Sequence, residues 1–165
     1  MRVLTVAVLL FGVVRITAVT AGDDTAQRAA IQAVLDAHGT AWTKGDAVAA
    51  AAVMTEDADW VSGDGSIYEG RMAIEAAHRE WLTGDAKGSR HAHPGRPEIR
   101  FIRPDVAIVD GDSYMGGLRD EQGKEIPPIF SRYTAVLVKN CEKWKVTAFR
   151  SLPQLKSTLT SADVH

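Results

Sequence analysis

Two apolar stripes at helical spacing each carry one histidine and one tryptophan in this 165-residue chain. The stripes are Ile31, Val34, Leu35, His38, Ala41 and Trp42, and Ile74, Ala77, His78 and Trp81. A helix face that only packs has little use for an imidazole, because burying one requires a hydrogen-bond partner. The two stripes therefore predict a cavity that holds a few polar groups.

The two histidines are the candidate catalytic residues. Histidine changes its charge near neutral pH, so His38 and His78 could act as an acid/base pair. The alternative is that both only line the cavity, where they hydrogen-bond to neighbours or to a polar group of a ligand.

A set of aromatic side chains could bind the apolar part of a ligand by stacking, or could simply pack in the core. They are Trp42, Trp60, Trp81 and Phe149. Arg132 lies in a predicted strand with Phe130 on the same face. If that face lines the cavity, the guanidinium would bind a carboxylate or phosphate. The alternatives are an ion pair with Asp110 or Asp112, or exposure to solvent.

His91 and His93 raise the question of a metal site near His78. They fall in a predicted loop over residues 85–97, and neither a cysteine pair nor HExxH spacing accompanies them. We expect a solvated loop and no metal. No Gly-rich dinucleotide motif follows a predicted strand, so we also expect no cofactor.

The elements that must position these residues form an α+β pattern. Periodicity and capping residues predict helices over residues 25–44, 47–54 and 71–83. A strand pair over 59–62 and 66–69 interrupts them, and strands over 98–103, 106–118, 129–139 and 144–152 follow. Gly111, Gly116 and Gly117 predict bulges that bend the longest strand. We expect a cone-shaped roll, with three N-terminal helices packed on a strongly bent antiparallel sheet.

Residues 1–21 have the features of a signal peptide. Arg2 precedes an apolar run over residues 3–14, and small residues end at Ala21. The run is too short to span a bilayer, so we expect export without stable membrane insertion. The alternative is an uncleaved tether. The mature domain would cover residues 22–152, with a flexible C-terminal tail over 153–165.

Composition excludes some classes of partner. The formal net charge is −2 at pH 7, and no basic patch indicates nucleic-acid binding. Cys141 is the only cysteine, so no intramolecular disulfide can form.

An ordered set of short motifs resembles the nuclear transport factor 2-like superfamily, and within it the SgcJ/EcaC-type, SnoaL-like group. The motifs are AWTKGD at 41–46, MTEDAD at 54–59, YEGRMAI at 68–74, SRYTAVLV at 131–138 and WKVTAF at 144–149. The resemblance implies a cone with a ligand cavity, and a homodimer formed through the sheet.

The ketosteroid isomerases of this superfamily provide a residue-by-residue comparison. Their general-base aspartate corresponds to Ser62, their oxyanion-hole tyrosine to His38, and their second oxyanion acid to a position near Phe130. A serine cannot replace that base, and phenylalanine donates no hydrogen bond. The isomerase mechanism is therefore not expected, although Ser62 and Phe130 remain candidate ligand contacts.

Two function classes stay open. The first is an exported protein that binds a small, partly apolar molecule, with an anionic end if Arg132 lines the cavity. The second is a cofactor-independent isomerase, dehydratase or cyclase that uses the cavity histidines; a lesser third is a module that uses its sheet to bind a partner. An open pocket with a carboxylate within hydrogen-bond reach of both histidines favours the enzyme, and one without it favours the binder.

Overall fold

The computed structural model describes residues 21–154. Residues 1–20 of the predicted signal peptide and residues 155–165 of the predicted tail lie outside this part of the chain, so both boundaries stay predictions. The elements in chain order are α1 (Ala21–Thr43), α2 (Ala47–Ala52), β1 (Met54–Val61), β2 (Ile67–Glu69), α3 (Arg71–Thr83), β3 (Arg90–Ala92), β4 (Glu98–Arg103), β5 (Val106–Gly116), β6 (Ile129–Asn140) and β7 (Lys143–Pro153).

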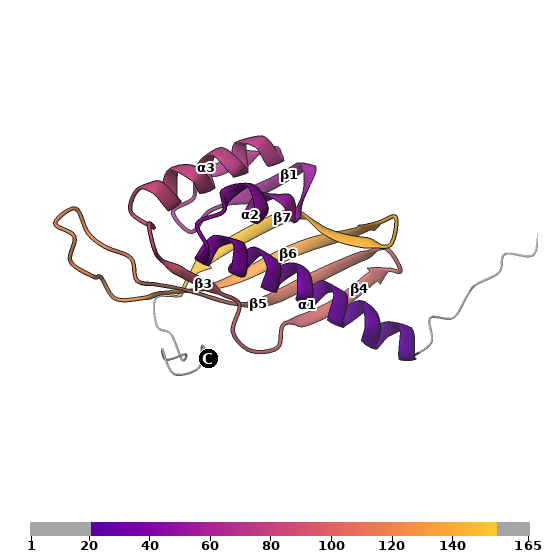
Figure 1. Cartoon of the computed structure of the whole chain (residues 1–165). Coiled ribbons are helices and arrows are strands. Elements are labelled where there is room, and N and C mark those ends of the chain that lie inside the picture. The colour runs from indigo at the N-terminus through magenta and orange to yellow at the C-terminus, as the bar shows by residue number, and fades with distance from the viewer. Residues whose placement is uncertain (1–20, 155–165) are drawn as a thin grey trace, which may run out of the picture.

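The seven strands form one curved, open sheet in the order β2-β1-β7-β6-β5-β3, with β4 also paired to β5. All paired strands are antiparallel except β1 and β7, which run parallel. The three helices lie on one side of the sheet, with α1 crossing in front of β4, β5 and β6 (Figure 1). The predicted α+β roll is therefore confirmed, with one parallel pair added.

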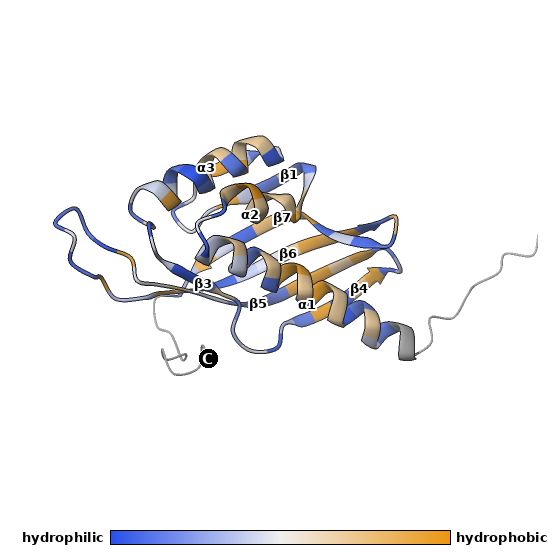
Figure 2. Ribbon diagram, viewed as in Figure 1, coloured by the Kyte–Doolittle hydropathy of each residue, from blue (hydrophilic) through white to orange (hydrophobic). Residues whose placement is uncertain are grey.

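The main core lies between α1 and the inner face of the sheet. Ile31 and Leu35 of α1 are buried, and they belong to one cluster with Val109, Tyr133 and Leu137 from the central strands. Apolar residues follow these strands beneath α1, whereas the loop that joins β5 to β6 is mostly hydrophilic (Figure 2). Apolar side chains therefore fill the space between α1 and one end of the sheet, and the cavity described below lies at the other end.

Local chemistry sets the helix boundaries. Gly45 adopts a φ of 74°, which ends α1, and the Asp46 side chain then accepts a hydrogen bond from the backbone N–H of Ala49 at the start of α2. Gly70 adopts a φ of 82° before α3 and donates to the carbonyl of Ala58 at 2.7 Å. The left-handed conformation at both glycines lets the chain turn tightly between elements.

Several element boundaries differ from the sequence expectation. The helix predicted over residues 47–54 ends at Ala52, and β1 begins at Met54 instead of residue 59, because Met54, Ala58 and Trp60 point inward and are buried. Part of the predicted loop over 85–97 is also a strand, β3, which pairs with residues 114–116 of β5. A three-residue strand carries little propensity signal of its own and forms because β5 offers a free edge.

Within residues 21–154, no helix has the length and apolar character needed to cross a membrane.

Candidate functional site

An open cavity of about 800 Å³ lies at the end of the roll opposite the solid core. Its walls come from α1, β1, the C-terminal end of α3, β3 and the three long strands. The large apolar side chains on its surface are Trp42, Trp60, Trp81, Met115, Leu118, Ile126, Ile129 and Phe149. A cavity of this size with mostly apolar walls and a few polar groups is typical of a small-molecule site.

Serine hydroxyls supply polarity on the sheet side of the cavity. Ser113 of β5 and Ser131 of β6 lie directly opposite each other in the strand register, and Ser151 of β7 also lines the cavity. These hydroxyls can donate or accept a hydrogen bond, so they can orient a ligand without fixing its charge.

The structure brings most of the predicted site residues together. The predicted residues that line the cavity are His38, Trp42, Trp60, Ser62, Trp81 and Phe149. Their role in binding stays a prediction. The other predicted residues, His78, Phe130 and Arg132, do not line it.

Arg132 and Phe130 lie on the outer face of the sheet, which corrects the predicted placement. Ser131 and Tyr133 are buried and point inward, so strand alternation turns Arg132 and Phe130 outward. The Arg132 guanidinium lies 3.5 Å from Asp112 on the neighbouring strand, and 3.8 Å from Glu98. The ion-pair alternative is therefore the one that the structure supports.

His78 is completely buried behind the cavity wall. Its ring contacts Trp60, Trp42 and His38, with centroid separations of 5.1, 5.2 and 5.5 Å. Burial, together with the charge of a protonated His91, lowers the pKa of His78 to about 4. His78 is therefore neutral at pH 7 and lies one layer away from any bound ligand.

Within residues 21–154, no carboxylate forms a hydrogen bond or ion pair with His38 or His78. Nε2 of His38 and both ring nitrogens of His78 are buried without a hydrogen-bond partner. Asp59, the acid that lies nearest to Trp60 in sequence, instead pairs with Arg150. The site therefore lacks the acidic partner that an acid/base pair of histidines would need.

His91 and His93 are part of the interior, which corrects the prediction of a solvated loop. His91 is buried, and both ring nitrogens of His93 are shielded from solvent. The backbone of His91 makes two hydrogen bonds to Thr43 of α1, one through its N–H and one through its carbonyl. Its N–H donates to Oγ1 of Thr43 at 3.2 Å, and that hydroxyl donates to its carbonyl at 3.4 Å. His91 and His93 are two residues apart, and residues at that spacing in a strand point to the same face. This spacing was the signal in the sequence that could have placed both side chains together.

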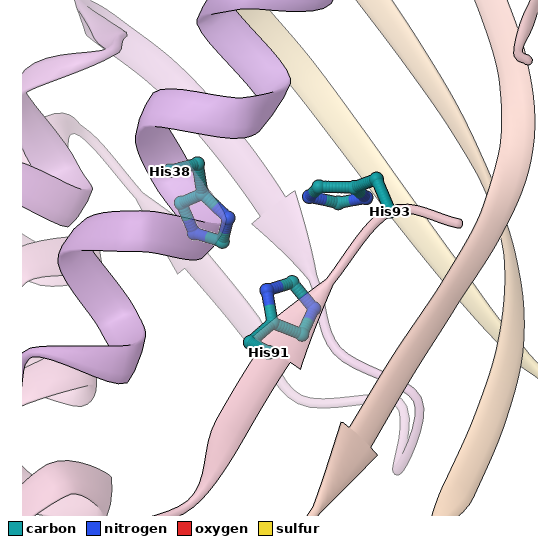
Figure 3. Close-up of side chains that lie close together, drawn as sticks. All are labelled: His38, His91 and His93. Atoms are coloured by element: carbon teal, nitrogen blue, oxygen red, sulfur yellow. The ribbon is translucent and has the colours of Figure 1, made fainter. Parts of the chain in front are cut away.

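His38, His91 and His93 form a cluster that the sequence did not predict. One nitrogen from each ring lies within 4.8 Å of the other two. Figure 3 shows His38 on α1 facing His91 on β3, with His93 just beyond the strand and its ring turned toward both. His38 and His91 also line the cavity. Burial is the main cause that lowers the pKa of all three, so the cluster is uncharged at neutral pH.

The mouth of the cavity is acidic. Asp64, Asp85, Asp120 and Glu121 surround it, and Arg119 is the one basic residue among its lining side chains. Hydrogen bonds from Ser66 lower the pKa of Asp64, which keeps it charged. The anionic ligand end was inferred from Arg132, which lies outside the cavity, and the charge at the mouth does not favour it.

Comparisons with known proteins agree with this architecture. A model of the SnoaL-like domain matches residues 23–150. No curated protein matches the chain. An uncharacterised protein with a cystatin-like fold from Caulobacter vibrioides superposes with a TM-score of 0.68 and 25% identity, over 76% of this chain and 88% of its own.

Two further solved structures share the fold at lower identity. A hexachlorocyclohexane dehydrochlorinase, LinA type 2, has a TM-score of 0.74 and 20% identity, over 86% of this chain and 95% of its own. An NTF-2-like protein of unknown function from Shewanella oneidensis MR-1 has a TM-score of 0.64 and 19% identity, over 76% of this chain and 98% of its own.

The narrower SgcJ/EcaC-type assignment stays a prediction. The match to the family model covers nearly all of the described residues, and it agrees with the helices, sheet and cavity described above. The chain belongs to the SnoaL-like domain family of the nuclear transport factor 2-like superfamily.

Proposed function

We propose that this protein is an exported binding protein that holds a small, mostly apolar molecule in its cavity. The observation that carries the proposal is the open cavity of about 800 Å³ with tryptophans on three elements around it. Trp42 and Trp60 are buried, so their indole faces are already fixed before a ligand arrives. Binding to fixed aromatic walls costs little conformational entropy.

The polar groups of the cavity limit the charge of the ligand. Serine hydroxyls lie on the sheet side and carboxylates surround the mouth. A molecule with an apolar body, buried hydroxyl or carbonyl groups and a neutral or cationic outer end matches this distribution. An anionic outer end would face like charges at the mouth.

The alternative is a cofactor-independent isomerase, dehydratase or cyclase. The SnoaL-like family includes both ligand-binding proteins and enzymes of this kind. Such a mechanism needs a histidine at the cavity surface with a second group that holds or accepts its proton. His38 has the position, but Nε2 of His38 has no partner and His78 is enclosed, so the binding function is the better supported of the two.

The test is to identify a retained ligand and then to block its site. Native mass spectrometry of protein purified from its own host would report the mass of a bound molecule. Nile red, a neutral apolar fluorophore, would report cavity binding by its fluorescence. Ser131→Trp fills the cavity from the sheet side and should reduce Nile red affinity at least about 10-fold, the effect of losing about 1.4 kcal/mol.

Arg132→Ala is the matched control, because this residue lies next to Ser131 on the opposite face. Unchanged Nile red binding in Ser131→Trp would overturn the cavity as the binding site. Turnover of the retained molecule by the purified protein, lost in His38→Gln, would favour the enzyme instead.

A further inference from the structure

We propose that His38, His91 and His93 form a binding site for a divalent transition-metal ion, with Zn²⁺ the best match, in the inner wall of the cavity. This inference goes beyond the proposed binding function and does not depend on it. It rests on the spacing of the three rings, on their unsatisfied nitrogens and on the contacts that hold β3 against α1.

The spacing is close to that of a three-histidine metal site. In a tetrahedral zinc site the Zn–N bonds are about 2.0–2.1 Å, so ligand nitrogens lie about 3.4 Å apart. Here one nitrogen from each of the three rings lies within 4.8 Å of the other two. Ring rotation about the two side-chain torsions moves a histidine nitrogen by more than the remaining difference. A metal can therefore be bound without a change in the backbone.

Four of the six ring nitrogens in this cluster are buried without a hydrogen-bond partner. Nε2 of His38, Nδ1 of His91 and both nitrogens of His93 are buried and make no hydrogen bond. Each unsatisfied buried polar atom costs free energy, so a native protein rarely places several side by side. An ion bound among the three rings would accept a lone pair from one nitrogen of each ring and reduce that cost.

Hydrogen bonds next to the cluster fix α1, which carries His38, to the segment that carries His91. Thr43 of α1 binds the backbone of His91, and Nε1 of Trp42 donates to Oγ of Ser89 at 2.9 Å, immediately before β3. Gly39 has no side chain at the point where α1 meets β3. These contacts fix the backbones that carry His38 and His91 relative to each other, so only the rings have to rotate to bind an ion.

The ligand types indicate which ion fits. Neutral imidazole is the preferred ligand of zinc, copper and nickel, whereas magnesium and calcium prefer carboxylate and carbonyl oxygen. The cluster contains no acid, and the single cysteine, Cys141, is exposed in the turn between β6 and β7. The three-imidazole set therefore matches Zn²⁺ better than Mg²⁺ or Ca²⁺.

The cluster leaves one coordination position free. Three protein ligands with an open fourth position are typical of sites where zinc binds water or a substrate atom. His38 and His91 line the cavity, so the open position faces it. A bound ion would therefore present a water molecule to the cavity, or contact an oxygen or nitrogen atom of the molecule held there.

The first experiment is a titration of the chelator-treated protein with Co²⁺, followed by Zn²⁺. We expect one equivalent of Co²⁺ to bind and to give the intense visible absorption of a four- or five-coordinate site. Zn²⁺ should then displace it. Absence of binding by either ion at micromolar concentration would overturn the proposal.

Matched variants locate the site. His91→Gln and His93→Gln should each weaken Co²⁺ binding by more than about 100-fold, since even an outer-shell partner costs about 10–100-fold. His78→Gln is the control, because His78 is a buried histidine beside the cluster but not part of it. Its Co²⁺ affinity should stay within about 3-fold of the wild-type value, well below the cost of an outer-shell partner.

A measurement on the unmodified protein covers the case in which a variant fails to fold. Imidazole ¹H–¹⁵N spectra recorded with and without Zn²⁺ should show three histidines moving to metal-bound positions. The chain has one further histidine near its C-terminus, His165. Zn²⁺-dependent changes confined to the His165 signals, or Zn²⁺ binding lost only in His165→Gln, would overturn the proposal. Nile red binding to the chelator-treated protein separates failure of the metal site from failure of the cavity as a binding site.

Discussion

Gly39 of α1 lies directly against the carbonyl oxygen of His91 on β3. A Cβ atom on Gly39 would approach that oxygen to 2.9 Å, closer than side-chain carbons come to backbone in proteins. The helix and the strand are therefore packed at backbone distance, one residue away from His38. A glycine inside a helix usually lowers stability relative to alanine, so its presence here indicates that close packing outweighs helix propensity.

Gly39→Ala should therefore destabilise the protein although it improves helix propensity. The added methyl group forces the backbone of β3 away, and overpacking of this kind costs about 1–3 kcal/mol. Urea unfolding measures the loss. Ala37→Gly, at an exposed position of the same helix, measures what glycine costs relative to alanine in this helix. We expect that substitution to lower the free energy of unfolding by about 1 kcal/mol. Equal or greater stability of Gly39→Ala would show that β3 moves aside freely.

Stability of the metal-free protein should fall as the pH is lowered from about 6.5 to about 4. The pKa of His78 is lowered to about 4 in the folded state, whereas the unfolded chain has the ordinary value of 6.5. Above pH 6.5 His78 is neutral in both the folded and the unfolded state, so it does not make the free energy of unfolding depend on pH. Below it the unfolded state gains a proton that the folded state does not, which costs up to about 3 kcal/mol.

Urea unfolding at pH 7, 6 and 5 in the presence of a chelator measures this loss. His78→Phe removes the titrating group while keeping an aromatic ring at the position, so its stability should depend less on pH. A wild-type stability that is the same at pH 5 and pH 7 would contradict the assignment of His78 as a buried neutral histidine.

Arg132→Ala should have a small effect on both folding and binding. Its ion pairs with Asp112 and Glu98 lie on an exposed face, where such pairs contribute about 0–1 kcal/mol. Urea unfolding and Nile red titration of the same preparation test both expectations. A large loss of Nile red affinity would mean that the outer face of β6 belongs to the binding site.

We expect the protein to be a homodimer that associates through the outer face of its sheet. Sedimentation at micromolar concentration should give about twice the monomer mass. Leu152 is 61% exposed on β7 opposite Arg132, so Leu152→Glu should shift the equilibrium toward the monomer. Met72→Glu, at an exposed apolar residue on α3, should leave the mass unchanged. A wild-type monomer would refute the dimer.

We expect the mature protein to begin near Gly22. N-terminal sequencing of periplasmic or extracellular material tests this, because signal peptidase should cut after the small residues that end at Ala21. Recovery of the protein in the cytoplasm with Met1 intact would contradict export.

The helices were predictable because their caps and their apolar periodicity agree. Asp46 and Gly70 mark the starts of α2 and α3, and the stripes that contain His38 and His78 are buried except for Val34 and Trp81, which are half-buried. Local signals decide such features, so one sequence is sufficient to find them.

The face of β6 was not predictable in the same way. Both faces of this strand mix polar and apolar residues: Phe130 and Arg132 alternate with Ser131 and Tyr133. The pattern therefore does not say which set points inward, and only pairing with β5 and β7 decides it.

The histidine cluster was missed because β3 is defined by tertiary pairing. Arg90, His91 and Ala92 have no strong strand propensity, and their spacing from His38 in sequence carries no information about contact. Once β3 pairs with β5, the alternation of strand side chains turns His91 inward, and His93 follows it on the same side.

The unsatisfied nitrogens have a consequence for how long the protein survives in its compartment. Seven buried side-chain nitrogens of the described residues, six of them on histidines, have no hydrogen-bond partner. A bound molecule or ion that pairs with the nitrogens of His38, His91 or His93 raises the free energy of unfolding, and proteases cleave mainly the unfolded fraction. We therefore expect unoccupied copies to be degraded faster, so that the steady-state amount of the protein follows the supply of what it binds.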